Sequence, residues 1–185
     1  MTAVFTASEN DRDDIGPLFR LLSAKHSVSA LSSNNVNINH SSEFLLLPLQ
    51  SRSISVNCNC AAIMFAPCSM AKYLPENCII LCFDEQTALC CSGKKRQLIS
   101  CGMHNKDTVT LSSMESGKPV LSIQRQLAAF SGDIIDVGDY PLITDENDHR
   151  LVMAAAVLLL LCGNPLDPDS FYDQSSTTVP PTLSK

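Results

Sequence analysis

The sequence predicts a mainly β fold of the α+β class, an antiparallel sandwich or barrel with one buried hydrophobic helix near its C-terminus. The chain has 185 residues, of which 45% are hydrophobic, and this is enough to form the core of one domain. Short apolar runs recur about every ten residues between turn signals, a spacing typical of antiparallel sheets. One segment, residues 151–162, has no polar face. A helix that is apolar all round must be buried on every side.

The first 42 residues are expected to form one short helix followed by a linker. Asp13 and Asp14 can cap this helix. Residues 27–42 are rich in serine and asparagine, which is typical of a loop. The start of the chain shows no secretory signal, so we expect a cytoplasmic protein that is not secreted. The apolar face of the helix would consist of Ile15, Leu18, Phe19 and Leu22.

Residues 43–165 are expected to form the β-rich domain, with residues 166–185 as a disordered tail. Breakers such as Pro67 separate many of the candidate strands. A hairpin is predicted at Glu115–Lys118, where the apolar residues of the two flanking runs alternate with polar ones. The candidate strands are 43–49, 53–58, 61–66, 78–83, 87–91, 97–101, 108–112, 119–124 and 134–137.

The helix predicted over residues 148–162 carries the clearest local signals. Acidic residues occupy its first turn, alanine and leucine fill its middle, and Gly163-Asn164-Pro165 ends it. Its apolar part, 151–162, would be about 18 Å long, whereas a membrane core is about 30 Å thick. The helix is therefore expected inside the protein.

The nine cysteines are unusual for a chain of this length. No C-x-x-C pair occurs, so a zinc site is not expected. An odd number of cysteines without an export signal also argues against a disulfide framework. We expect most of them to be buried free thiols, with S-acylation of exposed ones as the alternative. They are Cys58, Cys60, Cys68, Cys78, Cys82, Cys90, Cys91, Cys101 and Cys162.

The net charge is −6, which argues against a nucleic-acid partner. Residues 133–185 account for this acidity, with nine acidic and two basic residues. The one basic cluster, Lys94-Lys95-Arg96, lies at a predicted hairpin tip. It is the candidate site for anionic lipid headgroups, and the alternative is a solvated turn.

No catalytic motif occurs in the sequence. The patterns G-x-x-x-x-G-K-[ST], G-x-G-x-x-G, H-E-x-x-H and G-x-S-x-G are all absent. The four histidines are isolated, and a pairing of Cys101 with His104 across the fold is the nucleophile that the sequence leaves open. We therefore expect no catalytic residue, no metal and no cofactor.

Three stretches, residues 120–130, 133–140 and 148–162, resemble the late strand, acidic stretch and closing helix of the phospholipid scramblase branch of the tubby-like superfamily. The resemblance covers about residues 76–163. It implies an antiparallel β-barrel, or a barrel-like sheet, around the buried hydrophobic C-terminal helix. Leu127 replaces the family's tryptophan, and Gly138 replaces an aspartate of its calcium-binding stretch.

The resemblance implies a non-enzymatic domain that binds a membrane surface, through anionic phospholipid headgroups, or a protein partner. Calcium binding is not expected, since too few acidic ligands remain in the acidic stretch. One alternative is a structural or host-interaction protein of unrelated β-rich fold, whose acidic C-terminal region contacts a basic partner. A second alternative, from another class, is an enzyme with a cysteine nucleophile.

Overall fold

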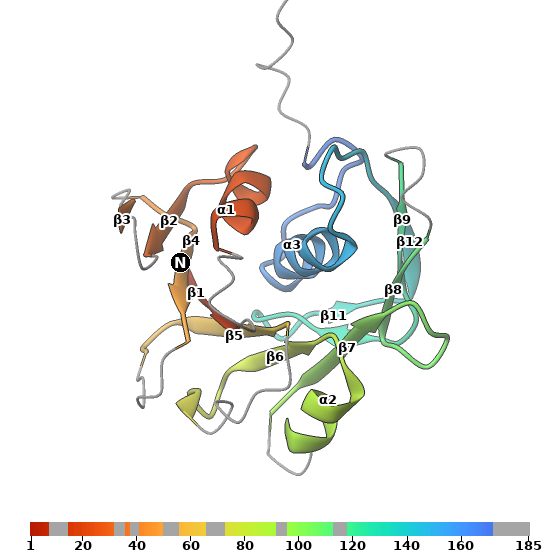
Figure 1. The fold of residues 1–185 in the computed structure, drawn as a ribbon, viewed down its shortest axis with the longest axis horizontal. Coiled ribbons are helices and arrows are strands. Elements are labelled where there is room, and N and C mark those ends of the chain that lie inside the picture. Colours follow the sequence, from red (N-terminus) through yellow and green to blue (C-terminus); the bar gives the residue numbers. More distant parts are fainter. Residues whose placement is uncertain are drawn as a thin grey trace, which may run out of the picture.

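Ten strands form one curved sheet in the computed structural model (Figure 1). The structure describes residues 1–7, 15–31, 36–37, 41–49, 56–65, 73–91, 96–112 and 118–171. The strand order is β12-β9-β8-β7-β6-β5-β1-β4-β2-β3, and β10 and β11 pair separately. The strands are β1 (Thr2–Ala7), β2 (Val28–Leu31), β3 (Val36–Asn37), β4 (Phe44–Pro48), β5 (Asn59–Met64), β6 (Ile79–Cys82), β7 (Leu98–Gly102), β8 (Val109–Leu111), β9 (Val120–Ile123), β10 (Leu127–Ala128), β11 (Ile134–Ile135) and β12 (Gly138–Pro141). The helices are α1 (Ile15–Ser23), α2 (Glu85–Cys91) and α3 (His149–Leu161).

The expected antiparallel barrel is wrong, because the sheet is open and its centre is parallel. The strands from β2 through β4, β1, β5, β6 and β7 to β8 pair in parallel. Antiparallel pairs occur at the two ends, where β12 and β3 form the edges. All six residues of β1 and all four of β6 are buried. Continuous apolar runs of this kind are typical of parallel strands covered on both faces.

Helices cover both faces of the sheet. The sheet curves around α3, and α1 packs beside α3 on the same face, while α2 lies on the opposite face (Figure 1). The sheet has one hydrophobic core on each face, and alternate residues of the central strands point into one core or the other. Ala61 and Ile63 of β5 face α3, and Cys60 and Ala62 face the opposite core. The domain is therefore a layered α/β structure and not a β shell around one helix.

The prediction of a buried helix over 148–162 is confirmed by α3. Every residue from Leu151 to Leu161 is buried. The Asp148 side chain caps the helix by accepting a hydrogen bond from the Arg150 N–H at 3.0 Å. Gly163 follows the helix with φ +75°, a conformation that favours glycine at a helix end. Among the described residues, no helix is long and apolar enough to span a membrane.

Several local predictions can be compared directly with the structure. The antiparallel pairing of β8 with β9 confirms the hairpin, although its tip at 113–117 lies outside the described residues. Helix α1 has the expected buried residues Ile15, Leu18 and Leu22, although the proposed capping residues 13–14 are not described. Residues 87–91 were expected to form a strand but belong to α2. Within the expected linker, Val28–Leu31 is a strand of the sheet.

Candidate functional site

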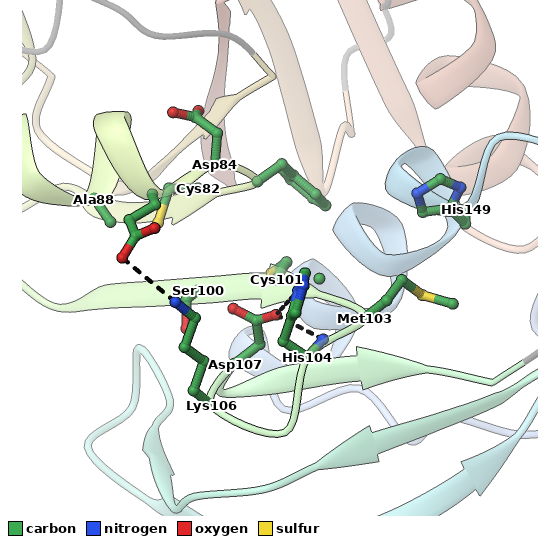
Figure 2. Close-up of a pocket in the computed structure, with 13 residues that line it drawn as sticks. Cys82, Asp84, Ala88, Ser100, Cys101, Met103, His104, Lys106, Asp107 and His149 are labelled. Carbon is green, nitrogen blue, oxygen red and sulfur yellow. Dashed lines mark hydrogen bonds and ion pairs between the residues drawn. The ribbon is translucent and has the colours of Figure 1, made fainter.

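A pocket of about 500 Å³ lies at the carboxyl ends of β6 and β7. These neighbouring strands are parallel, so their carboxyl ends meet at the same edge of the sheet. In open α/β sheets, ligands bind in the crevice outside the carboxyl ends of the strands. The N-terminus of α3 contributes His149 from across the pocket (Figure 2). The lining residues are Cys82, Phe83, Asp84, Glu85, Ala88, Ser100, Cys101, Gly102, Met103, His104, Lys106, Asp107 and His149.

The apolar part of the pocket wall includes Phe83 and Met103. The Phe83 ring stacks on Phe65, with ring centroids 5.1 Å apart and an interplanar angle of 30°. The Arg150 guanidinium lies 5.5 Å from the centroid of the Phe65 ring. Met103 is 55% exposed, which is unusual for a large apolar side chain. The pocket thus presents the aromatic ring of Phe83, which is positioned by its stacking on Phe65.

Asp84 joins the end of β6 to the start of α2. Its Oδ1 atom accepts a hydrogen bond from the Thr87 N–H at 2.7 Å, which caps the helix. Its Oδ2 atom is buried and has no hydrogen-bond partner within the described part of the chain. A buried carboxylate oxygen without a partner carries a desolvation cost, and a ligand that donates a hydrogen bond to it would remove this cost.

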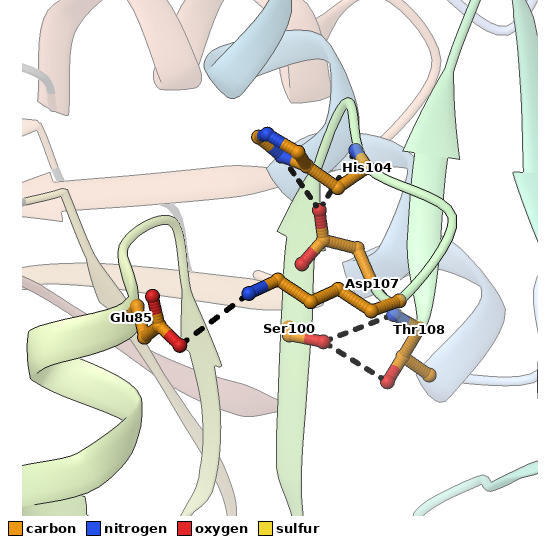
Figure 3. Close-up of polar contacts among 6 residues, drawn as sticks. Glu85, Ser100, His104, Asp107 and Thr108 are labelled. Atoms are coloured by element: carbon orange, nitrogen blue, oxygen red, sulfur yellow. Dashed lines mark hydrogen bonds and ion pairs between the residues drawn. The ribbon is translucent and has the colours of Figure 1, made fainter.

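A tight turn, His104–Asp107, follows β7 and lines the pocket. Figure 3 shows its polar contacts. The Asp107 N–H donates to the His104 carbonyl at 2.9 Å, and Asp107 Oδ2 accepts from the His104 N–H at 3.0 Å. The same oxygen lies 3.7 Å from His104 Nδ1. The imidazole, 78% exposed, is therefore held beside a carboxylate at the mouth of the pocket.

Acidic side chains outnumber basic ones around the pocket. Asp84, Glu85 and Asp107 line it together with a single lysine, Lys106. Lys106 Nζ lies 3.4 Å from Glu85 Oε1, so its charge is already engaged. The pocket therefore favours ligand groups that donate hydrogen bonds over groups that carry several negative charges.

Two pocket cysteines are poor nucleophiles. Burial raises the pKa of Cys82 to about 12, with Cys91, Asp84 and Asp107 adding to the effect. Burial also raises the pKa of Cys101 well above its usual value. A thiol must ionise to act as a nucleophile. The pairing of Cys101 with His104, left open by the sequence, therefore lacks an available thiolate.

This shift predicts a loss of stability at alkaline pH. The folded state holds the Cys82 proton up to pH about 12, whereas the unfolded chain releases it near pH 9. Stability is therefore fully present below pH 9 and is lost as the pH rises from 9 towards 12, by about 1 kcal/mol per pH unit for one such group. Urea unfolding between pH 8.5 and 10.5 measures this slope. Cys82→Ala should reduce this slope by about 1 kcal/mol per pH unit while Cys101 keeps its own contribution, and Cys90→Ala, at an exposed thiol, should leave the slope unchanged. Equal slopes for the Cys82→Ala variant and the parent would contradict the assignment.

Of the basic cluster predicted from the sequence, the structure describes Arg96, which does not line the pocket. Arg96 is half-buried, and its Nη2 atom donates a hydrogen bond to the Leu74 carbonyl at 2.6 Å. Lys94 and Lys95 lie outside the described residues, so the lipid-headgroup site stays a prediction. Asp136 and Asp139 accept hydrogen bonds from Gln126 and Ser122 respectively. Among the described residues, no group of three or more His, Cys, Asp or Glu could hold a metal ion.

The fold and the pocket define the class of the domain: an α/β domain with a pocket at the carboxyl edge of its parallel sheet. Solved structures with the same fold cover nearly the whole chain. The match to MurF ligase from Thermotoga maritima in complex with ADP covers 97% of this chain and 49% of the ligase chain, with a TM-score of 0.59 and 16% sequence identity. MurF from Acinetobacter baumannii matches 92% of this chain and 44% of its own, with a TM-score of 0.56 and 13% identity.

A third structure, a UDP-N-acetylmuramoyl-L-alanyl-D-glutamate–2,6-diaminopimelate ligase, has a TM-score of 0.53 and 10% identity over 97% of this chain and 46% of its own. The chain thus spans about half the length of each of these ligases. No family model matches the sequence, and no curated protein matches it. The fold is therefore similar to that of the Mur ligases.

These structures overturn the resemblance to scramblases and tubby-like proteins. The apolar helix that suggested it packs on a parallel sheet of the Mur ligase type and does not thread a barrel. The non-enzymatic, lipid-binding function inferred from that resemblance is overturned with it. This comparison also contradicts the expectation of a non-enzymatic protein, because the solved structures that share the fold are ligases.

Proposed function

We propose that this chain is the nucleotide-binding domain of a Mur ligase-like enzyme and that it binds an adenine nucleotide in the pocket at the carboxyl ends of β6 and β7. The observation that carries the proposal is the match of 97% of the chain to a ligase solved in complex with ADP. The position of the pocket supports it, since open α/β sheets bind ligands outside the carboxyl ends of their strands.

The pocket has the size and chemistry for a nucleoside. Its volume of about 500 Å³ lies within the usual range for small-molecule sites. Phe83 and Met103 offer apolar surface for a purine ring. The Oδ2 atom of Asp84 and the Asp107 carboxylate can accept hydrogen bonds from amino or hydroxyl groups.

The sequence gives little support for the binding of phosphate groups. The pattern G-x-x-x-x-G-K-[ST] is absent, and residues 8–14, between β1 and α1, contain no glycine or lysine but four acidic residues. The acidic balance of the pocket also disfavours a polyphosphate. Recognition should therefore depend on the base and ribose, and adenosine and ADP should bind with similar affinity.

Calorimetric titration of the whole chain with adenosine, ADP and GDP tests this proposal. Adenosine and ADP should bind with dissociation constants within about threefold of each other, and GDP more weakly. Phe83→Ala should weaken adenosine binding by about tenfold or more, because base–aromatic stacking contributes about 1–3 kcal/mol.

The matched control is Phe130→Ala, which removes another half-buried phenylalanine that does not line the pocket. It should leave adenosine affinity unchanged. Absence of binding of all three ligands at millimolar concentration would refute the proposal. Equal weakening by Phe83→Ala and Phe130→Ala would show that binding, if present, takes place elsewhere.

A further inference from the structure

A pair of cysteines lies on the opposite edge of the sheet from the pocket. Cys60 is the second residue of β5, and Cys78 immediately precedes β6. The register pairs Ala61 with Ile79, so one step back along both strands places Cys60 opposite Cys78. Both side chains belong to the core that faces away from α3.

The spacing of paired positions suits a covalent link. Neighbouring strands lie about 4.8 Å apart. Disulfides form between residues whose Cα atoms are about 4.4–6.8 Å apart. The register pairing at this point therefore places the two backbones within reach of a disulfide bond. Both side chains are buried, so a peroxide reaches them when the strand ends open locally.

The surroundings of the two thiols shift their pKa values in opposite directions. A hydrogen bond from Cys78 lowers the pKa of Cys60, and the positive charge of Arg96 lowers it further against the opposing effect of burial. The same hydrogen bond raises the pKa of Cys78. As a neutral thiol, Cys60 can instead donate to Asn77 Oδ1 at 3.5 Å. The pair thus combines one thiol that ionises more readily with a neighbour that keeps its proton.

We propose that Cys60 and Cys78 form a reversible intramolecular disulfide when the protein meets a hydroperoxide. The Cys60 thiolate attacks the peroxide O–O bond, which gives a sulfenic acid at Cys60 and releases hydroxide or alkoxide. This step also removes the Cys60 thiolate, whose hydrogen bond and negative charge raise the pKa of Cys78. Cys78 then ionises more readily, its thiolate attacks the Cys60 sulfur, and its proton leaves with the hydroxyl group of the sulfenic acid as water. In total the two thiols lose two electrons and two protons, and the peroxide is reduced. A dithiol reductant reverses the reaction by thiol–disulfide exchange. This inference does not depend on the proposed nucleotide site.

The test treats the folded full-length protein with hydrogen peroxide, blocks remaining thiols with iodoacetamide and maps disulfides by proteolysis and tandem mass spectrometry. The expected product is a peptide pair linked through Cys60 and Cys78, lighter by two hydrogens than its reduced parts and released by dithiothreitol. Cys78→Ser should abolish the link and leave a sulfenic acid at Cys60 that dimedone traps.

Two control variants decide whether the link is specific. Cys82→Ser removes another buried thiol next to the same strand pair, and Cys58→Ser removes the nearest cysteine in sequence to Cys60. Both should leave the link between Cys60 and Cys78 unchanged. The proposal is overturned if Cys60 and Cys78 stay open to alkylation after treatment of the folded protein and subsequent denaturation. It is also overturned if the linked peptides contain any other pair of cysteines.

Discussion

Replacing Leu158 by aspartate is expected to abolish cooperative folding. Leu158 lies in the middle of α3 and is fully buried, as are its neighbours along the helix. Loss of a buried leucine costs about 2–5 kcal/mol, and a buried carboxylate without a partner adds several more. Since a domain of this size has a total stability of about 5–15 kcal/mol, little of it should remain. Circular dichroism during thermal unfolding measures the result.

The same substitution at an exposed leucine provides the control for Leu158→Asp. Leu89 lies on α2 and is 68% exposed. Leu89→Asp should therefore keep a cooperative transition close to that of the parent protein, within about 0.5 kcal/mol. A cooperative transition of Leu158→Asp near the parent melting temperature would show that α3 is not the central element of the core.

Local signals made α3 predictable from the sequence. Its cap at Asp148, its uninterrupted apolar residues and its stop at Gly163 all lie within one short segment, and the structure confirms each of them. The length of the apolar run also excluded a membrane span correctly for this helix. The hairpin of β8 and β9 depends on equally local information, namely alternation of apolar residues on both sides of a turn.

The parallel sheet was missed because its pairing depends on distant parts of the chain. β1 is paired with β5, more than fifty residues away in sequence, and with β4 on its other side. One signal in the sequence was available: β6 is a continuous apolar run, and β1 contains the apolar run Ala3-Val4-Phe5, as expected for strands buried on both faces. The regular spacing of the short strands outweighed this signal, and an antiparallel barrel was therefore predicted.

The pocket could be predicted only in part. It is assembled from the ends of β6 and β7, the turn after β7, and the start of α3. One local signal was available, because Asp84 and Glu85 directly follow the apolar run of residues 79–83, which begins with β6. The contact between Gly102 and Asp107 depends on backbone geometry, and no pattern of residue types reveals it.

The effect of Gly102→Ala is expected to be large because Asp107 occupies the space that a side chain would need. A Cβ atom at residue 102 would overlap with Asp107 Oδ2 and would lie 3.0 Å from its Cγ atom. The carboxylate would have to move away from the His104 N–H, to which it is bound at 3.0 Å. Losing this charged hydrogen bond should cost about 1–3 kcal/mol of stability. If the pocket binds adenosine as proposed, its affinity should fall by about tenfold.

A double-mutant cycle with Asp107→Ala separates this explanation from a general intolerance of glycine substitution. Once the Asp107 carboxylate is removed, an alanine at residue 102 no longer meets it. The double variant should therefore be about as stable as Asp107→Ala alone, with a coupling energy of about 1 kcal/mol or more between the two sites. Urea unfolding of the four proteins measures this coupling. Additive losses would contradict the steric explanation and would mean that Gly102 is needed for a reason other than the position of Asp107.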